Sequence, residues 1–213
     1  MPENLIFDML YVDNQKTETM TAAQLAAYLK ALDEEPDQVA ASVLRLALAT
    51  GMRKSAILAL RWNDIDLERG LITLRGENAK SGKTAILPLN NMAMEIIRQL
   101  PRDGDLLFMG KFGGHREGIS RMARRVRDKA PLKDFRPMHG LCHVFASTLA
   151  SNSVDLYTLQ ALLTHGSPAM TQHYAHLSND HLRVAANMAN QLGKKKEEEL
   201  GIFENIKGVM AGL

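Results

Sequence analysis

The stretch TGMRKSAILALRWNDID, residues 50–66, marks the point where a helical pattern gives way to a β-type pattern. Before it, QVAASVLRLALAT (38–50) is apolar on nearly every side and predicts a buried helix, which Gly51 interrupts. Within the stretch 50–66, SAILALRW keeps apolar residues at helical spacing and predicts a second helical piece. The expected core residues of this piece are Ile57, Leu58 and Leu60.

Two short β-type runs follow, LITLRG (71–76) and TAILPLN (84–90). The polar segment ENAKSGK between them predicts a hairpin, with Gly82 easing the turn. Further helices are predicted over residues 22–32, 92–100, 119–130, 139–152, 156–165, 171–177 and 180–192. Thr21 is the expected N-cap of the first of these. The pattern therefore predicts a mainly α fold with a small antiparallel β-sheet.

The composition is that of an ordinary folded protein. The chain has 213 residues, of which 46% are hydrophobic and 23% are charged, which suits one globular domain with short tails. The sequence contains no apolar run of about 18 residues, the length needed to span a membrane, and its start does not resemble a signal peptide. One cysteine, Cys142, excludes an internal disulfide and a cysteine-rich zinc site. These features predict a cytoplasmic protein.

Charge is distributed unevenly along the chain. Residues 1–40 hold two basic and eight acidic residues, whereas residues 111–136 hold nine basic and three acidic ones. A local basic stretch in a chain whose formal net charge is only +2 is what a phosphate-facing surface needs. A solvated helix face is the other interpretation, and charge alone does not decide between them.

Histidine is concentrated in the second half of the chain. Five of the seven histidines fall in one segment: His139, His143, His165, His173 and His176. Zinc binding is one interpretation, because His139 and His143 share a helix face at spacing i, i+4. However, Gly140 occupies the place where a zinc metalloprotease carries its glutamate. The cluster therefore favours a polar or catalytic site over a metal site.

Four segments occur in an order that resembles the catalytic domain of the tyrosine recombinases, the phage integrase family. TGMRKSAILALRWNDID is similar to the first family box, and NAKSGKTAILPL to the hairpin that carries a catalytic lysine. HGLCHVFAS resembles the second box, His-x-Leu-Arg-His, and LLTHGSPAMTQHYAHL resembles the third. The spacings from His139 to Cys142, His165 and Tyr174 are those of the family. The resemblance implies the tyrosine recombinase catalytic-domain fold.

The resemblance also implies a catalytic set. Tyr174 is the expected nucleophile on a DNA phosphodiester, forming a 3′-phosphotyrosyl bond and a free 5′-hydroxyl. Arg53 is expected to clamp the phosphate and Lys80 to protonate the leaving oxygen. The remaining implied roles are proton transfer at the tyrosine for His139, a phosphate hydrogen bond for His165, and buttressing or core packing for His143 and His176. No cofactor or metal is implied, because the covalent intermediate stores the bond energy.

Three positions depart from the family pattern. Cys142 stands in place of the second arginine, and a thiol offers neither the charge nor the two-pronged phosphate contact of a guanidinium. By analogy with lost arginine fingers and oxyanion donors, the expected rate loss is roughly 10²–10⁵. Ala56 replaces a common acidic residue, and Thr164 replaces a usual glycine. Cys142 beside His143 is also open to interpretation as a nucleophile, although adjacent helix positions point about 100° apart.

The predicted organisation has three parts: a lead-in over residues 1–20, the catalytic domain over residues 21–192, and a charged linker with a C-terminal tail over residues 193–213. The family's N-terminal DNA-binding domain has no room before Thr21. The expected partner is double-stranded DNA, bound by a homotetramer on paired sites. The resemblance implies a bacterial or phage-encoded recombinase that acts by strand cleavage and rejoining, impaired by Cys142. The alternative is a DNA-binding module on the same fold that no longer cuts.

The tail carries apolar residues on a polar tether. LGIFENIKGVMAGL (200–213) follows the run KKKEEE and contains three glycines, so it is a poor helix in isolation. Docking onto its own core or onto a neighbouring protomer is one interpretation. A frayed terminus is the other.

Overall fold

The computed structural model describes residues 18–78 and 82–175 of the chain. Its α-helices are α1 (Ala22–Asp33), α2 (Gln38–Thr50), α3 (Lys54–Leu58), α4 (Asn91–Arg98), α5 (Ile119–Lys129), α6 (His139–Ser151), α7 (Leu156–Leu162) and α8 (Ala169–Gln172). Its strands are β1 (Ile65–Asp66), β2 (Leu71–Leu74) and β3 (Ala85–Pro88), with two 3-10 helices, η1 (Trp62–Asp64) and η2 (Gly76–Asn78). The predicted mainly α fold with a small antiparallel sheet is confirmed.

Local signals set where the first helices begin and end. The Thr21 side chain accepts from the backbone N–H of Gln24, whose side chain accepts in return from the N–H of Thr21, so the predicted N-cap is a full capping box. Asp37 caps α2 with its side chain alone, which accepts the backbone N–H of Ala40, and α2 ends at Gly51 in the left-handed conformation, with φ of 68°. Left-handed backbone favours glycine because it has no Cβ.

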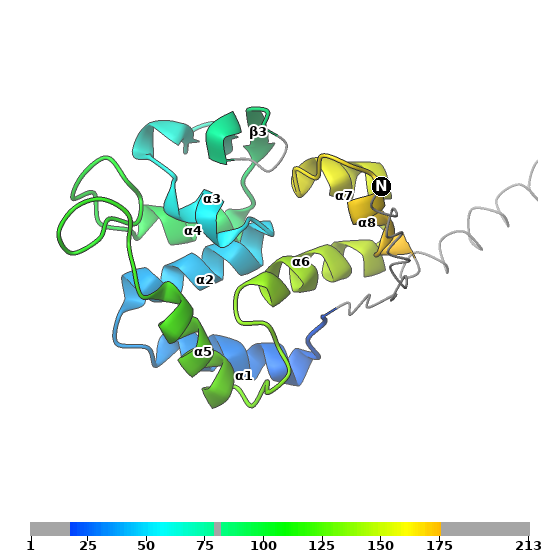
Figure 1. Ribbon diagram of the computed structural model, residues 1–213, viewed down its shortest axis with the longest axis horizontal. Helices are drawn as coiled ribbons and strands as arrows, with labels where there is room; N and C mark the ends of the chain where they lie inside the picture. The colour runs from blue at the N-terminus through cyan, green and yellow to red at the C-terminus, as the bar shows by residue number, and fades with distance from the viewer. Residues whose placement is uncertain (1–17, 79–81, 176–213) are drawn as a thin grey trace, which may run out of the picture.

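Helix α2 is the centre of the fold. It packs against α1, α3, α4, α5 and α6, and seven of its thirteen residues are buried (Figure 1). A Cβ on Gly51 would lie 2.4 Å from a ring carbon of Phe145, so only glycine lets the end of α2 approach α6 this closely. The break that follows α2 is therefore fixed against α6.

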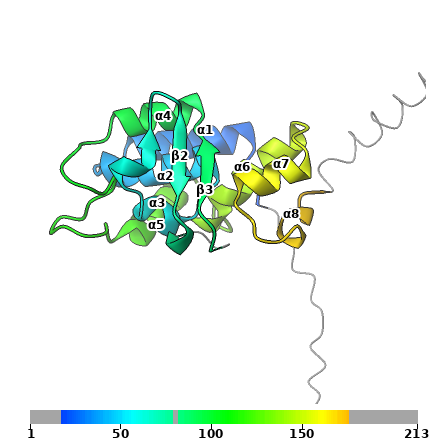
Figure 2. The same ribbon diagram turned by 90° about the horizontal axis from the view of Figure 1, so that it is seen from above.

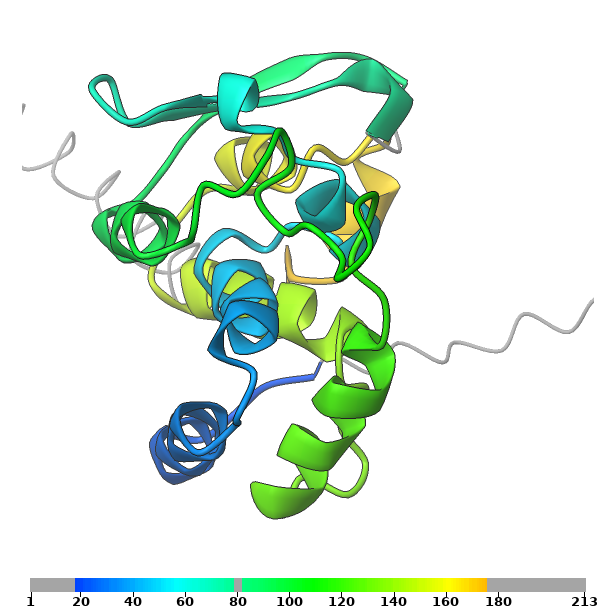
Figure 3. The same ribbon diagram turned by 90° about the vertical axis from the view of Figure 1, so that its left-hand side faces the viewer.

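The three strands form one antiparallel sheet in the order β1-β2-β3. Ile72 and Leu74 of β2 point into the core, as the two-residue period of a strand requires. The sheet lies on the opposite side of α2 from α1 and α5 (Figures 2 and 3). Gly82 has the positive φ expected of it in the hairpin. Strand β1 was not predicted.

Two predicted helices differ from the observed ones. The piece expected after Gly51 is helical only over α3, because the buried Asp64 draws the chain into a 3-10 turn by accepting the backbone N–H of Arg61 and Nε of Arg75. The short helical turn expected over residues 171–177 begins earlier, as α8, which ends before Tyr174, and residues 176 and 177 lie outside the described residues. The predicted helix over residues 180–192 and the tail lie outside the described residues.

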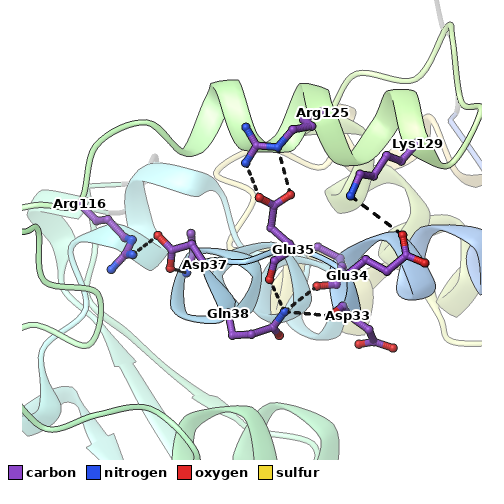
Figure 4. A network of polar contacts seen from close by, with 10 residues as sticks. Asp33, Glu34, Glu35, Asp37, Gln38, Arg116, Arg125 and Lys129 are labelled. Carbon is purple, nitrogen blue, oxygen red and sulfur yellow. Dashed lines mark hydrogen bonds and ion pairs between the residues drawn. The ribbon is translucent and has the colours of Figure 1, made fainter.

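The uneven charge distribution becomes a set of contacts between the N-terminal segment and residues 111–136 (Figure 4). Arg125 of α5 makes two hydrogen bonds to the buried carboxylate of Glu35, and Arg116 pairs with Asp37. Lys129 lies 4.0 Å from a carboxylate oxygen of Glu34. Arg116, Arg125 and Lys129 therefore connect α5 and the loop before it to the junction of α1 and α2. Neither a bare phosphate-facing surface nor a simple solvated helix face describes these three residues.

Other members of the basic stretch form no ion pair with another described residue: Lys111, Arg121, Arg124 and Lys133. Lys54, at the start of α3, donates to the hydroxyl of Ser120 at the start of α5. Helices α3 and α5 therefore meet at their N-terminal ends. No helix among residues 18–78 and 82–175 is long and apolar enough to cross a membrane.

Candidate active site

Three segments meet at the first half of α6. The break between α2 and α3 brings Arg53, α6 itself brings His139, Cys142 and His143, and the turn after α8 brings Tyr174. Cys142 joins α6 to the break, because its thiol donates to the carbonyl oxygen of Met52 across 3.4 Å. The fold thus gathers predicted site residues that are distant in the sequence.

Tyr174 is held by a histidine. Its hydroxyl oxygen lies 2.7 Å from Nδ1 of His143, and only 3% of the tyrosine is exposed. Burial and the neighbouring Cys142 raise the pKa of Tyr174 to about 12. The hydroxyl therefore keeps its proton at neutral pH and needs a base in order to act as a nucleophile.

His143 is placed to accept that proton. Burial, together with the nearby His139 and Arg136, lowers its pKa to about 4, so its ring is neutral at pH 7. In the tautomer protonated at Nε2, Nδ1 is free to accept the tyrosine proton. The ring of His139 packs edge-on against that of His143, with centroids 4.8 Å apart. Proton transfer was predicted for His139, whereas the 2.7 Å contact with the hydroxyl belongs to His143.

Cys142 is a neutral thiol. Burial raises its pKa to about 11 against the opposing effect of Arg53. A thiolate nucleophile at this position is therefore disfavoured, and the neighbouring His143 is turned toward Tyr174. Arg53, at the break immediately before α3, contributes positive charge to the surroundings of the thiol. One cation thus stands where the family pattern has two.

His165 lies in the turn between α7 and α8. Its Nδ1 is 2.9 Å from the hydroxyl of the buried Thr171, and its backbone N–H donates to Gln160. Thr171 in turn accepts the backbone N–H of Tyr174 through its carbonyl. His165 is therefore connected to the tyrosine turn through α8. Thr164, just before it, has φ of 50°, which explains in physical terms why a glycine suits this position.

Glu18 and Arg136 lie beside the site, and neither was predicted to belong to it. Glu18 accepts two hydrogen bonds from Arg136, at 2.7 Å from the backbone N–H and 2.9 Å from Nε. Both residues influence the pKa values of His143 and Tyr174. A signal for Arg136 was present, since it precedes His139 and His143 at spacings that continue one helix face. No sequence signal pointed to Glu18.

Two predicted residues, Lys80 and His176, lie outside the described residues. His173 is described and contributes to the electrostatics of His143. No group of three His, Cys, Asp or Glu side chains among the described residues is placed to hold a metal ion. What the site offers is a buried hydroxyl on a neutral base, with arginine and histidine side chains nearby.

Comparison with known proteins places this arrangement in a family. The model of the phage integrase family matches residues 18–181. The chain belongs to this family. It is 35% identical to the tyrosine recombinase XerC of Xanthomonas campestris pv. campestris (strain B100) over 167 residues, which cover 73% of this chain and 50% of that protein. It is 32% identical to XerC of Oceanobacillus iheyensis over 155 residues, which cover 68% and 51%.

Solved structures of the phage integrase family share the fold. The catalytic domain of bacteriophage HP1 integrase matches with a TM-score of 0.64 at 24% identity, covering 81% of this chain and 95% of that one. The Tn1549 transposon integrase in complex with a circular intermediate DNA matches with a TM-score of 0.70 at 19% identity, covering 84% and 68%. The chain spans about half the length of the curated relatives it matches. The predicted family and catalytic-domain fold are confirmed.

Proposed function

We propose that this chain is the catalytic part of a tyrosine recombinase, which cleaves and rejoins double-stranded DNA through a 3′-phosphotyrosyl intermediate. The observation that carries the proposal is the 2.7 Å contact between the Tyr174 hydroxyl and Nδ1 of the neutral His143. A buried hydroxyl on a neutral base is the pairing that nucleophilic catalysis needs. Membership of the phage integrase family supports the same reaction.

The first step moves two protons and exchanges one bond at phosphorus. The oxygen of Tyr174 attacks phosphorus while His143 takes the hydroxyl proton, and the bond from phosphorus to the 5′-oxygen breaks. The leaving oxygen takes a proton from Lys80, which keeps the general-acid role that the sequence predicts. Rejoining reverses these transfers, so no external energy source is required. His139, packed edge-on against His143, holds the ring of the base.

Arg53 supplies positive charge to the phosphate. Arg53 stands at the α2–α3 break, immediately before α3, and a guanidinium suits the two-pronged contact that spreads transition-state charge. His165 donates a further hydrogen bond to the phosphate in this scheme. Double-stranded DNA is the proposed partner, and the homotetramer on paired sites is part of the same proposal.

Replacement of the nucleophile tests the reaction. The Tyr174→Phe variant is expected to keep DNA binding and to form no covalent adduct on a nicked suicide substrate, because only the hydroxyl attacks phosphorus. Tyr157→Phe is the matched control, since Tyr157 is 83% exposed on α7 and away from His143. Adduct is measured by denaturing electrophoresis with labelled DNA. Adduct formation by Tyr174→Phe contradicts the assignment of the nucleophile.

The second candidate function is DNA binding without cleavage, and Cys142 is the observation that favours it. A neutral thiol with a pKa of about 11 cannot replace a phosphate-clamping guanidinium. An unmodified chain that binds DNA but forms no adduct, under conditions in which a related recombinase does, supports this candidate.

Introduction of the arginine tests whether Cys142 limits cleavage. Cys142→Arg is expected to raise the rate of adduct formation by about 10²-fold or more, because one charge-assisted clamp on an oxyanion has that effect. The control is Cys142→Ser, which keeps a small neutral donor toward the carbonyl of Met52 and should leave the rate near that of the unmodified chain. If Cys142→Arg folds and yields no more adduct, the missing charge is not what limits cleavage.

A further inference from the structure

The ion pair between Glu18 and Arg136 joins the N-terminal segment to the site. The carboxylate of Glu18 accepts from both the backbone N–H and Nε of Arg136, and its side chain is 11% exposed. The side chain of Arg136 is 51% exposed. The anion is therefore nearly enclosed, whereas the cation is open to a ligand from solvent.

The pair lies at the start of the helix that carries the site. The carbonyl of Arg136 accepts the backbone N–H of Gly140 in the first turn of α6. A carboxylate oxygen of Glu18 lies 3.0 Å from the position that a Cβ on Gly140 would occupy. Arg136 lies three residues before His139, the first residue of α6, and the ring of His139 packs against that of His143, which contacts Tyr174. The guanidinium is thus next to the residues proposed to act on DNA.

The two charges act on the nucleophile in opposite directions. Arg136 lowers the pKa of Tyr174, and Glu18 raises it. The same opposition holds at His143, whose pKa Arg136 lowers and Glu18 raises. While the pair is closed, the carboxylate offsets the charge of Arg136 at the site.

We propose that Arg136 binds a DNA phosphate beside Tyr174 and that Glu18 is the counterion that this phosphate displaces. The inference rests on the proposed function, because it assigns a phosphate ligand to the same site. The donors that now hold the carboxylate, Nε and a backbone N–H, suit phosphate oxygens equally well. The site lacks a charge at Cys142, and Arg136 supplies one from the preceding turn.

The displacement predicts opposite effects for the two partners. Arg136→Ala should weaken binding to a labelled linear duplex by about 3- to 10-fold and lower the salt slope of log K by about 0.9, the value for one lost phosphate contact. Glu18→Gln should strengthen binding by a similar factor, because the phosphate no longer competes with a carboxylate. The double variant should bind like Arg136→Ala, since Glu18 acts only through Arg136.

Each substitution has a matched control on the α1–α5 contact. Arg125→Ala removes a guanidinium of nearly equal exposure, 50%, that also pairs with an N-terminal carboxylate. Glu34→Gln removes a carboxylate that pairs with Lys129. If Arg136→Ala changes the affinity and salt slope no more than Arg125→Ala does, Arg136 contacts no phosphate. If Glu18→Gln weakens binding, Glu18 supports the arginine instead of competing with DNA. Either result overturns the proposal.

Binding and cleavage are measured separately so that the two proposals fail in different ways. The affinities and salt slopes need no adduct, so they test Arg136 even if the unmodified chain does not cut. Where adduct forms, Arg136→Ala should slow it at saturating DNA, whereas Arg125→Ala should not. An unchanged rate at saturation, together with an unchanged salt slope, removes Arg136 from the site.

Discussion

The residues of the candidate site are divided between two apolar clusters of very different size. The larger cluster extends from α1 to the first half of α6 and includes all seven buried residues of α2. Among residues 18–78 and 82–175, the smaller one is built from the end of α6, α7 and the turn after α8, and its buried residues are Ala146, Ala150, Leu159, Leu163 and Tyr174. Arg53 and Cys142 border the large cluster, whereas Tyr174, the proposed nucleophile, belongs to the small one.

This division has a consequence for stability. Local opening costs less free energy where fewer apolar groups are buried, and so the small cluster is expected to open without the large one. Tyr174 would then move relative to Arg53, while α2 and the α2–α3 break stay in place. The hydrogen bond to His143 is the polar contact that holds the tyrosine against α6.

The strongest test of this division is to make the same Leu→Ala substitution in each cluster and to compare the effects on stability. Leu44→Ala, in the centre of α2, should lower the global free energy of unfolding by about 3 kcal/mol, because Leu44 is fully buried in the large cluster. Leu159→Ala removes the same atoms from an equally buried site in α7. Its effect should appear as faster hydrogen exchange in α7 and α8, with little change in the denaturation midpoint.

The measurement is hydrogen exchange by mass spectrometry together with chemical denaturation of each variant. Ala substitution at the exposed Met92 of α4 is a control that leaves both clusters intact. If Leu159→Ala accelerates exchange in α2 as much as in α7, the two clusters form one cooperative unit and the division is wrong.

Acid should loosen the small cluster more than the large one. Burial holds the pKa of His143 at about 4, below its ordinary value of about 6.5, so the unfolded chain binds more protons between these values. The stability that neutral His143 contributes is present above about pH 6.5 and is lost as the pH falls toward about 4. For a half-buried group the loss at about pH 5 is expected to be about 1 kcal/mol.

Exchange in α7 and α8 at about pH 7.5 and about pH 5, corrected for the intrinsic effect of pH, measures this loss. The His143→Gln variant is the control, because glutamine keeps a hydrogen-bonding group near the Tyr174 hydroxyl and does not titrate in this range. The two proteins should differ at the higher pH and converge at the lower one. Parallel pH dependence in both would assign the titration to another group.

Local signals in the sequence predicted much of the fold but only part of the candidate site. The capping residue Thr21, the break at Gly51 and the apolar run of α2 each have a physical effect on their own neighbours, and all were predicted. The direct contact between His143 and Tyr174 was not predicted, because it depends on how α8 folds back against α6. A spacing along the chain does not encode that approach.

The charge pattern shows the same limit. Excess acid near the N-terminus and excess base in residues 111–136 were visible in the sequence, but their pairing across α1, α2 and α5 was not. Glu18 is the clearest example. A single carboxylate in a lead-in segment does not indicate a partner in the sequence, and its ion pair with Arg136 is visible only in the folded chain. Contacts between segments far apart in the chain require the tertiary structure.

The smallest expected effect concerns the turn that leads from α7 to α8. Thr164 adopts φ of 50°. In this left-handed region a β-branched side chain raises the free energy of the folded state by about 1–2 kcal/mol. Thr164→Gly removes that strain at the cost of about 0.5–1 kcal/mol of extra chain entropy in the unfolded state. The net gain of about 0.5 kcal/mol should slow hydrogen exchange in α7 and α8 and leave α2 unchanged. Thr164→Ala, which keeps a Cβ but loses the branch, should fall between the two. A glycine variant that exchanges faster than the alanine variant would show that chain entropy outweighs backbone strain in this turn.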